Sequence, residues 1–229
     1  MILSPSEADA LRLSVSVALR SVAFTLPFAL LLAWLLTRRR FLGRTLLDAF
    51  VHLPLVLPPV VIGYLLLVLF GVRGPIGGWL DHMFGIRLVF SRNGAALATA
   101  VMSFPLMVRA MRISLENIDR GLEQAARTLG AGALDRFATV TLPLMLPGIV
   151  AGAITAFSAA LGEFGAVITF VSNIPGETRT LPLALYTALQ TPDGDVAAAR
   201  LALISFVLGL AGLLLAELFA RRVRVLLGR

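Results

Sequence analysis

Glu163 is a titratable side chain inside a long apolar stretch, within the run LGEFGAVITF at residues 161–170. Burying a carboxylate at membrane depth is costly, and such a group usually faces a bundle interior, a cavity or a pathway. We therefore interpret Glu163, with Phe164 and Gly165, as lining or gating a passage. A carboxylate repels anions, so its expected partner is a polar group of the protein and not an anionic ligand. The alternative is that Glu163 lies near the outer mouth and reaches water.

The other reactive residue types do not form a recognisable catalytic or metal site. His52 and His82 are far apart in the chain and are expected on opposite sides of the membrane, so no metal site is predicted. The sequence contains no cysteine and no lysine, which excludes thiolate chemistry, a Ser-Lys dyad and the phosphate-binding loop GxxxxGK[ST]. We expect ATP hydrolysis, if any, on another polypeptide. A membrane-embedded enzyme or scaffold is a remote alternative.

Residues 123–143, EQAARTLGAGALDRFATVTLP, are polar and helix-prone between two apolar segments. Ala125 and Ala126 give a helix face with little bulk, so a partner surface can approach closely. Gly130 permits the positive φ with which many helices end, and Leu142 and Pro143 are expected to end a second short helix. The segment is predicted to be a partner-binding loop, with a solvated connector as the alternative. The charged residues that keep it hydrated are Glu123, Arg127, Asp135 and Arg136.

Composition indicates that most of these residues sit in lipid. The chain is 58% hydrophobic and 14% charged, whereas soluble domains are about 45–50% apolar and about 25% charged. A bilayer core of about 30 Å takes roughly 20 apolar residues in a helix. The stretches that meet this length are about 13–36, 46–70, 94–115, 144–171 and 201–220. We predict an all-α integral membrane protein with five transmembrane helices in a single permease domain, residues 1–229.

The distribution of arginine predicts the orientation. With the N-terminus outside and the C-terminus inside, thirteen of the twenty arginines fall on the cytoplasmic side, as the positive-inside rule requires. They are Arg38, Arg39, Arg40, Arg44, Arg109, Arg112, Arg120, Arg127, Arg136, Arg221, Arg222, Arg224 and Arg229. The net charge of +7 therefore reflects contact with membrane lipid and not with nucleic acid.

Further local features refine the spans. Pro54, Pro58 and Pro59 lack backbone donors, so they are expected to kink or open the second span, and Pro58 and Pro59 could shape a gate. Gly148 and Gly152 permit close helix contact in the fourth span. Outside, residues 72–93 suit a short interfacial helix. Hydroxyls that could line a weakly binding passage are Ser103, Thr155 and Ser158.

The spacing within 123–143 resembles the EAA loop of binding-protein-dependent ABC importer permeases. That pattern is Glu-Ala-Ala, three residues, Gly, nine residues, Ile, one residue, Leu-Pro. The sequence departs from it at Gln124 and Val140, and Glu123 could replace the lost charge. The resemblance implies a coupling helix, in the loop 116–143 between spans three and four, that docks on an ATPase subunit. The contact residues it implies are Glu123, Gln124, Ala125, Ala126, Arg127, Gly130, Asp135, Arg136, Leu142 and Pro143.

Three further segments resemble molybdate permeases of this class: HLPLVLPPVVIGYLLLVLFG (52–71), SFPLMVRAMR (103–112) and LGEFGAVITFVSNIPGETRTLPLALY (161–186). The resemblance implies a type I importer fold in the cell inner membrane and a homodimer. It also implies two cytoplasmic ATPase subunits that hold ATP-Mg, no cofactor on this chain, and an extracytoplasmic molybdate-binding protein. Sulfate, thiosulfate or tungstate is the alternative cargo. The residues expected to contact the binding protein are Asn173, Gly176, Glu177 and Arg179.

Overall fold

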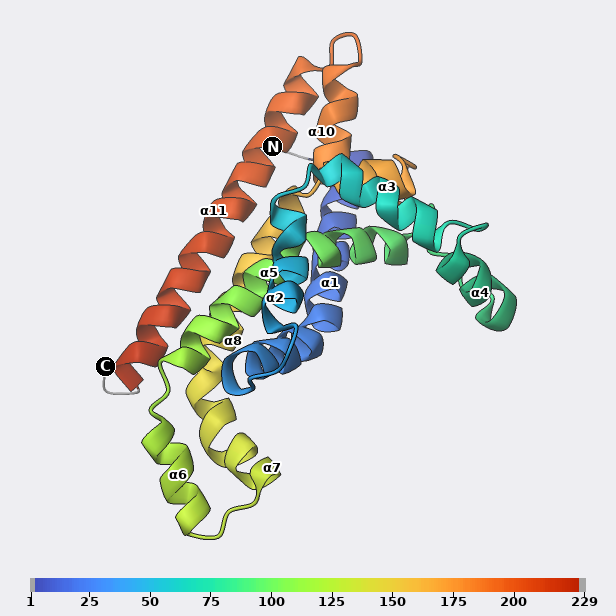
Figure 1. Cartoon of the computed structure of the whole chain (residues 1–229). Coiled ribbons are helices and arrows are strands. Elements are labelled where there is room, and N and C mark those ends of the chain that lie inside the picture. Colours follow the sequence, from blue (N-terminus) through green and yellow to red (C-terminus); the bar gives the residue numbers. More distant parts are fainter. Residues whose placement is uncertain (1–2, 227–229) are drawn as a thin grey trace.

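The computed structural model describes residues 3–226, and every regular element within that range is a helix (Figure 1). The elements are α1 (Pro5–Arg38), α2 (Arg44–His52), the 3-10 turn η1 (Leu53–Leu55), α3 (Pro59–Phe70), α4 (Pro75–Phe84), α5 (Arg92–Glu116), α6 (Arg120–Thr128), α7 (Ala133–Arg136), the π-helical turn η2 (Phe137–Thr141), α8 (Leu142–Gly162), α9 (Gly165–Val171), α10 (Leu181–Leu189) and α11 (Asp195–Leu226). Arg229, one of the arginines expected inside, lies outside the described residues.

Four helical stretches among the described residues are long and apolar enough to cross a membrane. They are α1, α5, the continuous stretch Ala133–Gly162 that ends with α8, and α11 over Asp195–Phe219. Because the stretch Ala133–Gly162 runs without a break through Leu142 and Pro143, the prediction that these two residues end a second short helix is wrong; proline is tolerated at the start of α8. A fifth span results if α2 with η1 and α3 are counted together, although they are bent by 111°. The predicted all-helical membrane architecture is confirmed, whereas the number of five spans stays a prediction.

The span predicted over residues 46–70 is not one continuous helix. Its first part ends at Leu55, and α3 starts at Pro59 after Pro58. Proline has no N–H to continue the hydrogen-bond ladder, but its fixed φ suits the first position of a helix. The predicted disruption at these prolines is therefore confirmed.

The span predicted over 144–171 is also not one helix. Helix α8 ends at Gly162, and the short helix α9 begins at Gly165. Between them the backbone of Glu163 is extended, with φ −70° and ψ 124°. The carboxylate of Glu163 accepts a hydrogen bond from the backbone N–H of Ala166 at 2.9 Å. This contact satisfies a donor in the first turn of α9, where no helical carbonyl is available.

Three helices, α1, α5 and α8, pack against one another to form the centre of the molecule. Helix α11 lies along α8 at one side, and α10 packs on the start of α11 (Figure 1). At Gly152 an added β-carbon would lie 3.2 Å from the carbonyl oxygen of Met107, and at Gly148 it would overlap Ser114. The predicted close packing at these two glycines is confirmed as contact between α8 and α5 of the same chain.

Large apolar side chains face outward along the bundle. Phe24, Leu31, Phe206 and Leu213 have exposed fractions of 58%, 63%, 67% and 67%. Exposed apolar surface of this extent marks contact with lipid or with another protein.

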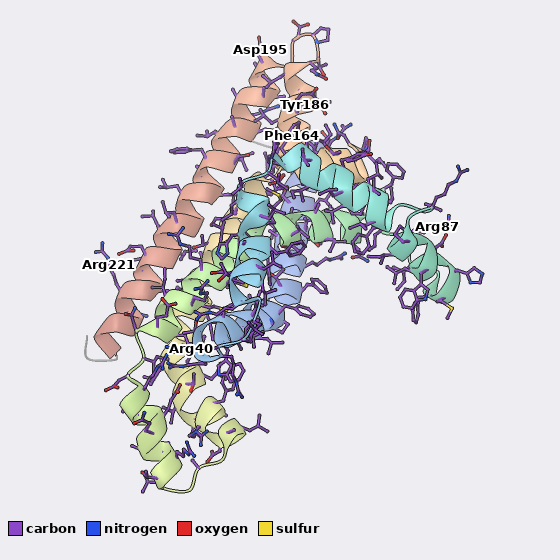
Figure 2. The ribbon with its side chains drawn as sticks, in the orientation of Figure 1. Arg40, Arg87, Phe164, Tyr186, Asp195 and Arg221 are labelled. Atoms are coloured by element: carbon purple, nitrogen blue, oxygen red, sulfur yellow. The ribbon has the colours of Figure 1, made fainter. Side chains whose placement is uncertain are left out.

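The two ends of the molecule differ. Figure 1 shows α6, α7, the turn after α1 and the end of α11 gathered at one end, with the α10–α11 connection at the opposite end. Figure 2 shows Arg40 and Arg221 toward the first end and Asp195 toward the second. The segments predicted to share the cytoplasmic side therefore lie at one end, and the orientation of that end stays a prediction.

Candidate functional site

The first candidate site is the loop from α6 to α8, which protrudes at one end of the bundle (Figure 1). The Asp119 carboxylate accepts from the Gly121 N–H at 2.8 Å and caps the start of α6. At its other end, Gly130 has φ +89°, and the Ala131 N–H donates to the Ala126 carbonyl at 3.0 Å. These contacts form a Schellman-type helix end, in which glycine takes the left-handed position. The positive φ predicted at Gly130 is confirmed.

The side chain of Glu123 ties this loop to the membrane helices. Its Oε1 accepts hydrogen bonds from Arg38 Nη2 at 3.0 Å and from Thr141 Oγ1 at 2.9 Å. The Arg38 side chain is 10% exposed and Thr141 is buried. Helix α6 is thereby joined to the end of α1 and to the base of α8. The carboxylate points inward, and the predicted contact of Glu123 with an ATPase stays untested.

The outer surface of the loop carries most of the other predicted contact residues. Those that are exposed are Gln124, Ala125, Arg127, Gly130, Asp135 and Pro143, and those half-buried are Ala126, Arg136 and Leu142. Arg136 donates from Nη1 to the Ala131 carbonyl at 3.0 Å and thus steadies the turn. A cavity of about 730 Å³ lies beside this contact, lined by residues of α1 and of the loop.

Two leucines in this loop were not among the predicted contacts. Leu129 and Leu134 are 88% and 85% exposed, on either side of the turn at Gly130. Contiguous exposed apolar surface marks interaction sites, so we predict that these two leucines contribute to a docking surface for another protein. The sequence signal was present, because both leucines interrupt a polar stretch close to its glycines.

The second candidate site lies where α3 crosses α9. An added β-carbon on Gly165 would lie 2.8 Å from the Pro59 Cβ, and one on Gly63 would lie 2.7 Å from the Ala166 carbonyl oxygen. The two broken segments therefore meet at their breaks through glycines. Tertiary structure brings together Pro59 and Gly165, two of the residues predicted to shape a gate.

Glu163 and Phe164 lie beside this contact in the break between α8 and α9. Both side chains are half-buried. The Phe164 ring stacks at a tilt against Tyr186 of α10, with centroids 5.2 Å apart, and Figure 2 shows the two side by side. Glu163 has no ion-pair partner among the described residues. Its role in a passage stays a prediction.

The three predicted passage hydroxyls do not share one accessible surface. Ser103 is buried and donates to the Thr99 carbonyl at 2.8 Å. The buried Ser158 hydroxyl faces Gly212 of α11 and has no hydrogen-bond partner among the described residues. Thr155 is exposed and donates to the Ala151 carbonyl at 2.8 Å. Ser103 and Ser158 therefore lie in helix contacts within the subunit.

At the opposite end, the loop between α9 and α10 is held in place by polar contacts. Asn173 accepts from Arg179 Nε at 2.9 Å and donates to Thr187 at 2.8 Å. Arg92 of α5 donates to the Gly176 carbonyl at 2.5 Å and lies 3.7 Å from the Glu177 carboxylate. Of the four residues predicted to contact a binding protein, Asn173 and Arg179 thus pair with each other, while Gly176 and Glu177 are exposed.

Comparison with known proteins identifies the class of protein that carries these two sites. The family described as "Binding-protein-dependent transport system inner membrane component" matches residues 25–225. The chain belongs to this family. As a member of the binding-protein-dependent transport family, it is a multi-pass protein of the inner membrane, which confirms the predicted location.

Individual relatives support the same assignment. The chain is 59% identical to the molybdenum transport system permease protein ModB of Escherichia coli K12, over the whole of both chains. It is 55% identical to ModB of Haemophilus influenzae, over 97% of each chain. It is 39% identical to the sulfate transport system permease protein CysT of Escherichia coli K12, over 97% of this chain and 81% of that one. The predicted resemblance to importer permeases is confirmed.

Solved structures agree with the fold of this family. A chain of a bacterial alginate ABC transporter, crystallised with an alginate pentasaccharide-bound periplasmic protein, superimposes with a TM-score of 0.75. The match covers 96% of this chain and 80% of that chain at 20% identity. A chain of an amino acid ABC transporter superimposes with a TM-score of 0.64, also at 20% identity. At this identity the likeness concerns the fold, and it confirms the predicted importer permease architecture.

Proposed function

We propose that this chain is the permease subunit of an ABC importer that moves molybdate across the cytoplasmic membrane. The observation that carries the proposal is the identity of 59% with a molybdenum permease, over the full length of both chains. The identity with a sulfate permease is 39% over a smaller share of that relative. Sulfate or thiosulfate is therefore the weaker alternative, and tungstate, which matches molybdate in charge and shape, is an alternative of the same class.

The chemistry of the passage fits a cargo that binds elsewhere. A doubly charged oxyanion cannot be buried in hydrocarbon without partners, and two of the three candidate hydroxyls are buried within the subunit. We infer that a separate extracytoplasmic binding protein supplies affinity and delivers the anion. The exposed Gly176 and Glu177 loop is the candidate surface for that protein.

Energy for transport is proposed to come from ATP-Mg held by two separate ATPase subunits. The exposed leucines at Leu129 and Leu134 support docking of such a subunit on the α6–α7 loop. Two copies of this chain enclose the passage, with the α6–α7 end facing the cytoplasm. ATP binding draws the two loops together, and the contacts of Glu123 transmit the movement to α1 and α8. The broken segments at Pro59 and Gly165 then change the access of the passage from one side to the other.

Uptake of labelled molybdate tests this proposal. Vesicles would contain this chain, the ATPase partner and the binding protein. The ATPase subunits and the ATP would both be on the inner side of the vesicle membrane. We expect ATP-dependent uptake that excess sulfate does not inhibit and that tungstate inhibits. Equal inhibition by sulfate would overturn the molybdate assignment while keeping the importer. Absence of uptake by a fully assembled complex would show that another solute is carried.

A further inference from the structure

The turn between α1 and α2 forms a basic cavity of about 550 Å³ with the end of α5 and the start of α6. The charged side chains that line it are Arg38, Arg39, Arg40, Arg44, Arg120 and Glu116. Five arginines and one glutamate thus line the cavity. A concave surface lined by charges of one sign concentrates ions of the opposite sign, so the cavity favours an anionic ligand.

Most of this positive charge is not neutralised within the protein. The Glu116 carboxylate pairs with Arg112, whose Nη2 lies 3.8 Å away, and Arg38 pairs with Glu123. Arg40, Arg44 and Arg120 have no acidic partner among the described residues. Guanidinium groups form strong, geometrically specific hydrogen bonds with phosphate oxygens. The three free arginines are therefore available to a phosphate.

An exposed apolar surface adjoins the cavity. Leu42, between Arg40 and Arg44 in the chain, is fully exposed. On the outer side of α2, Leu46 and Phe50 are 75% and 71% exposed. Trp34, which stacks under Arg39 with 5.3 Å between the guanidinium carbon and the ring centroid, belongs to a residue type enriched at membrane interfaces. A small inorganic anion would leave this apolar surface unexplained, whereas a lipid matches both parts.

We propose that the cavity binds the phosphate of an anionic phospholipid, whose acyl chains lie against Leu42, Leu46 and Phe50. Basic pockets at the membrane boundary recognise lipid headgroups in this way. The site also reaches the α6–α7 loop, because Arg120 is the first residue of α6 and Arg38 holds Glu123. A bound lipid therefore joins the end of α1 to that loop. The proposal goes beyond the transport function and does not depend on which solute is carried.

Fluorescence quenching by brominated lipids tests the proposal on the full-length chain in bilayers. The native tryptophans are removed by Trp34→Phe and Trp79→Phe, and Leu42→Trp, at a fully exposed position, places a reporter beside the cavity. Bilayers contain brominated phosphatidylglycerol in unbrominated phosphatidylcholine, or the reverse. The dependence of quenching on composition gives the binding constant of the anionic lipid relative to the zwitterionic lipid at this position.

Two double variants are compared in that background. Arg40→Gln with Arg44→Gln removes two cavity charges, while Arg221→Gln with Arg222→Gln removes two charges from the end of α11, at the same end of the molecule. We expect selective binding of phosphatidylglycerol that falls by about fivefold for each cavity arginine removed. The selectivity should be unchanged in the α11 variant. It should be partly retained when Arg40 and Arg44 are replaced by lysine, which keeps the charge but not the planar donor geometry. Circular dichroism and a monodisperse elution profile establish that each variant is folded.

Several outcomes would overturn the proposal. Equal quenching by both brominated lipids would show that no anionic lipid is selected. Equal loss of selectivity in the cavity and α11 variants would show that the preference for phosphatidylglycerol comes from the general surface charge and not from the cavity. Loss of selectivity on adding inorganic phosphate would assign the cavity to a free oxyanion. Absence of quenching by either lipid, with cross-linking between copies through a single cysteine at Leu46, would assign the surface to a second copy of the chain.

Discussion

Glu123 accepts a hydrogen bond from Arg38 at 3.0 Å, although 85 residues separate them in the chain. The same carboxylate oxygen accepts from Thr141 at 2.9 Å. One side chain therefore connects α6 to two membrane-crossing helices at their ends. We expect a movement of α6 to reach α1 and α8 through this contact.

We predict that Arg38 and Glu123 are energetically coupled. In a double-mutant cycle with Arg38→Gln and Glu123→Gln, the interaction energy should be about 1–2 kcal/mol, as for a partly buried, charge-assisted contact. Thermal unfolding of the detergent-solubilised subunit measures it. Arg127→Gln, on the exposed side of α6, serves as the control and should be additive with Arg38→Gln. Additivity of Arg38 and Glu123 would contradict the proposed connection.

We predict that Gly130→Pro abolishes uptake while the subunit still inserts and assembles. Proline requires a negative φ near −65° and has no N–H, whereas Gly130 has φ +89° and donates to the Arg127 carbonyl at 3.0 Å. Gly130→Ala should have a smaller effect, since the left-handed conformation costs about 1–2 kcal/mol for a residue with a β-carbon. Transport and membrane content are measured in the same vesicles.

Gly132→Ala is the matched control for this experiment. Gly132 has φ −66°, and a β-carbon there would meet nothing within 4 Å. Its uptake should be near that of the unaltered chain. Normal uptake by Gly130→Pro would show that transport does not depend on the conformation of this loop.

We predict that the charge of Glu163 matters beyond its hydrogen bond to Ala166. In Glu163→Gln the amide oxygen can still accept from the Ala166 N–H, so the start of α9 keeps its partner. Glu163→Ala removes both the charge and the acceptor. Both variants should lower the uptake rate by at least about tenfold, which corresponds to about 1.4 kcal/mol in the barrier. If Glu163→Gln were fully active and Glu163→Ala impaired, the role of Glu163 would be limited to accepting the hydrogen bond at the start of α9.

The orientation can be tested by labelling, because the sequence contains no cysteine. Thr128→Cys in the exposed end of α6 should react with an impermeant maleimide only from the cytoplasmic side. Glu177→Cys, at a side chain that is 58% exposed, should react only from the outside. The neighbouring Thr178 is fully buried and unsuitable. Labelling from the reversed sides would overturn the orientation and the position of the ATPase.

Several features of this protein follow from sequence alone because they depend on local physical chemistry. Apolar runs of sufficient length predicted α1, α5 and α11, since each must place about 20 residues in lipid. The left-handed conformation at Gly130 follows from glycine next to a helix end. The spacing from Gln124 to Pro143 resembles the EAA loop of importer permeases, and the importer class is what this resemblance implies. Proline likewise predicted the disruption near Pro58.

Tertiary structure decided what each of these residues contacts. The angle of 111° after Leu55 and the meeting of Pro59 with Gly165 depend on the packing of α3 on α9. The sequence predicts Ser103 and Ser158 in a passage, whereas the structure buries both hydroxyls within the subunit. An isolated hydroxyl in an apolar run does not reveal whether it faces water or a neighbouring helix. The inward direction of Glu123 depends on Arg38, which lies far away in sequence. Such pairings arise from the relative positions of whole helices, and no local pattern of residue types specifies those positions.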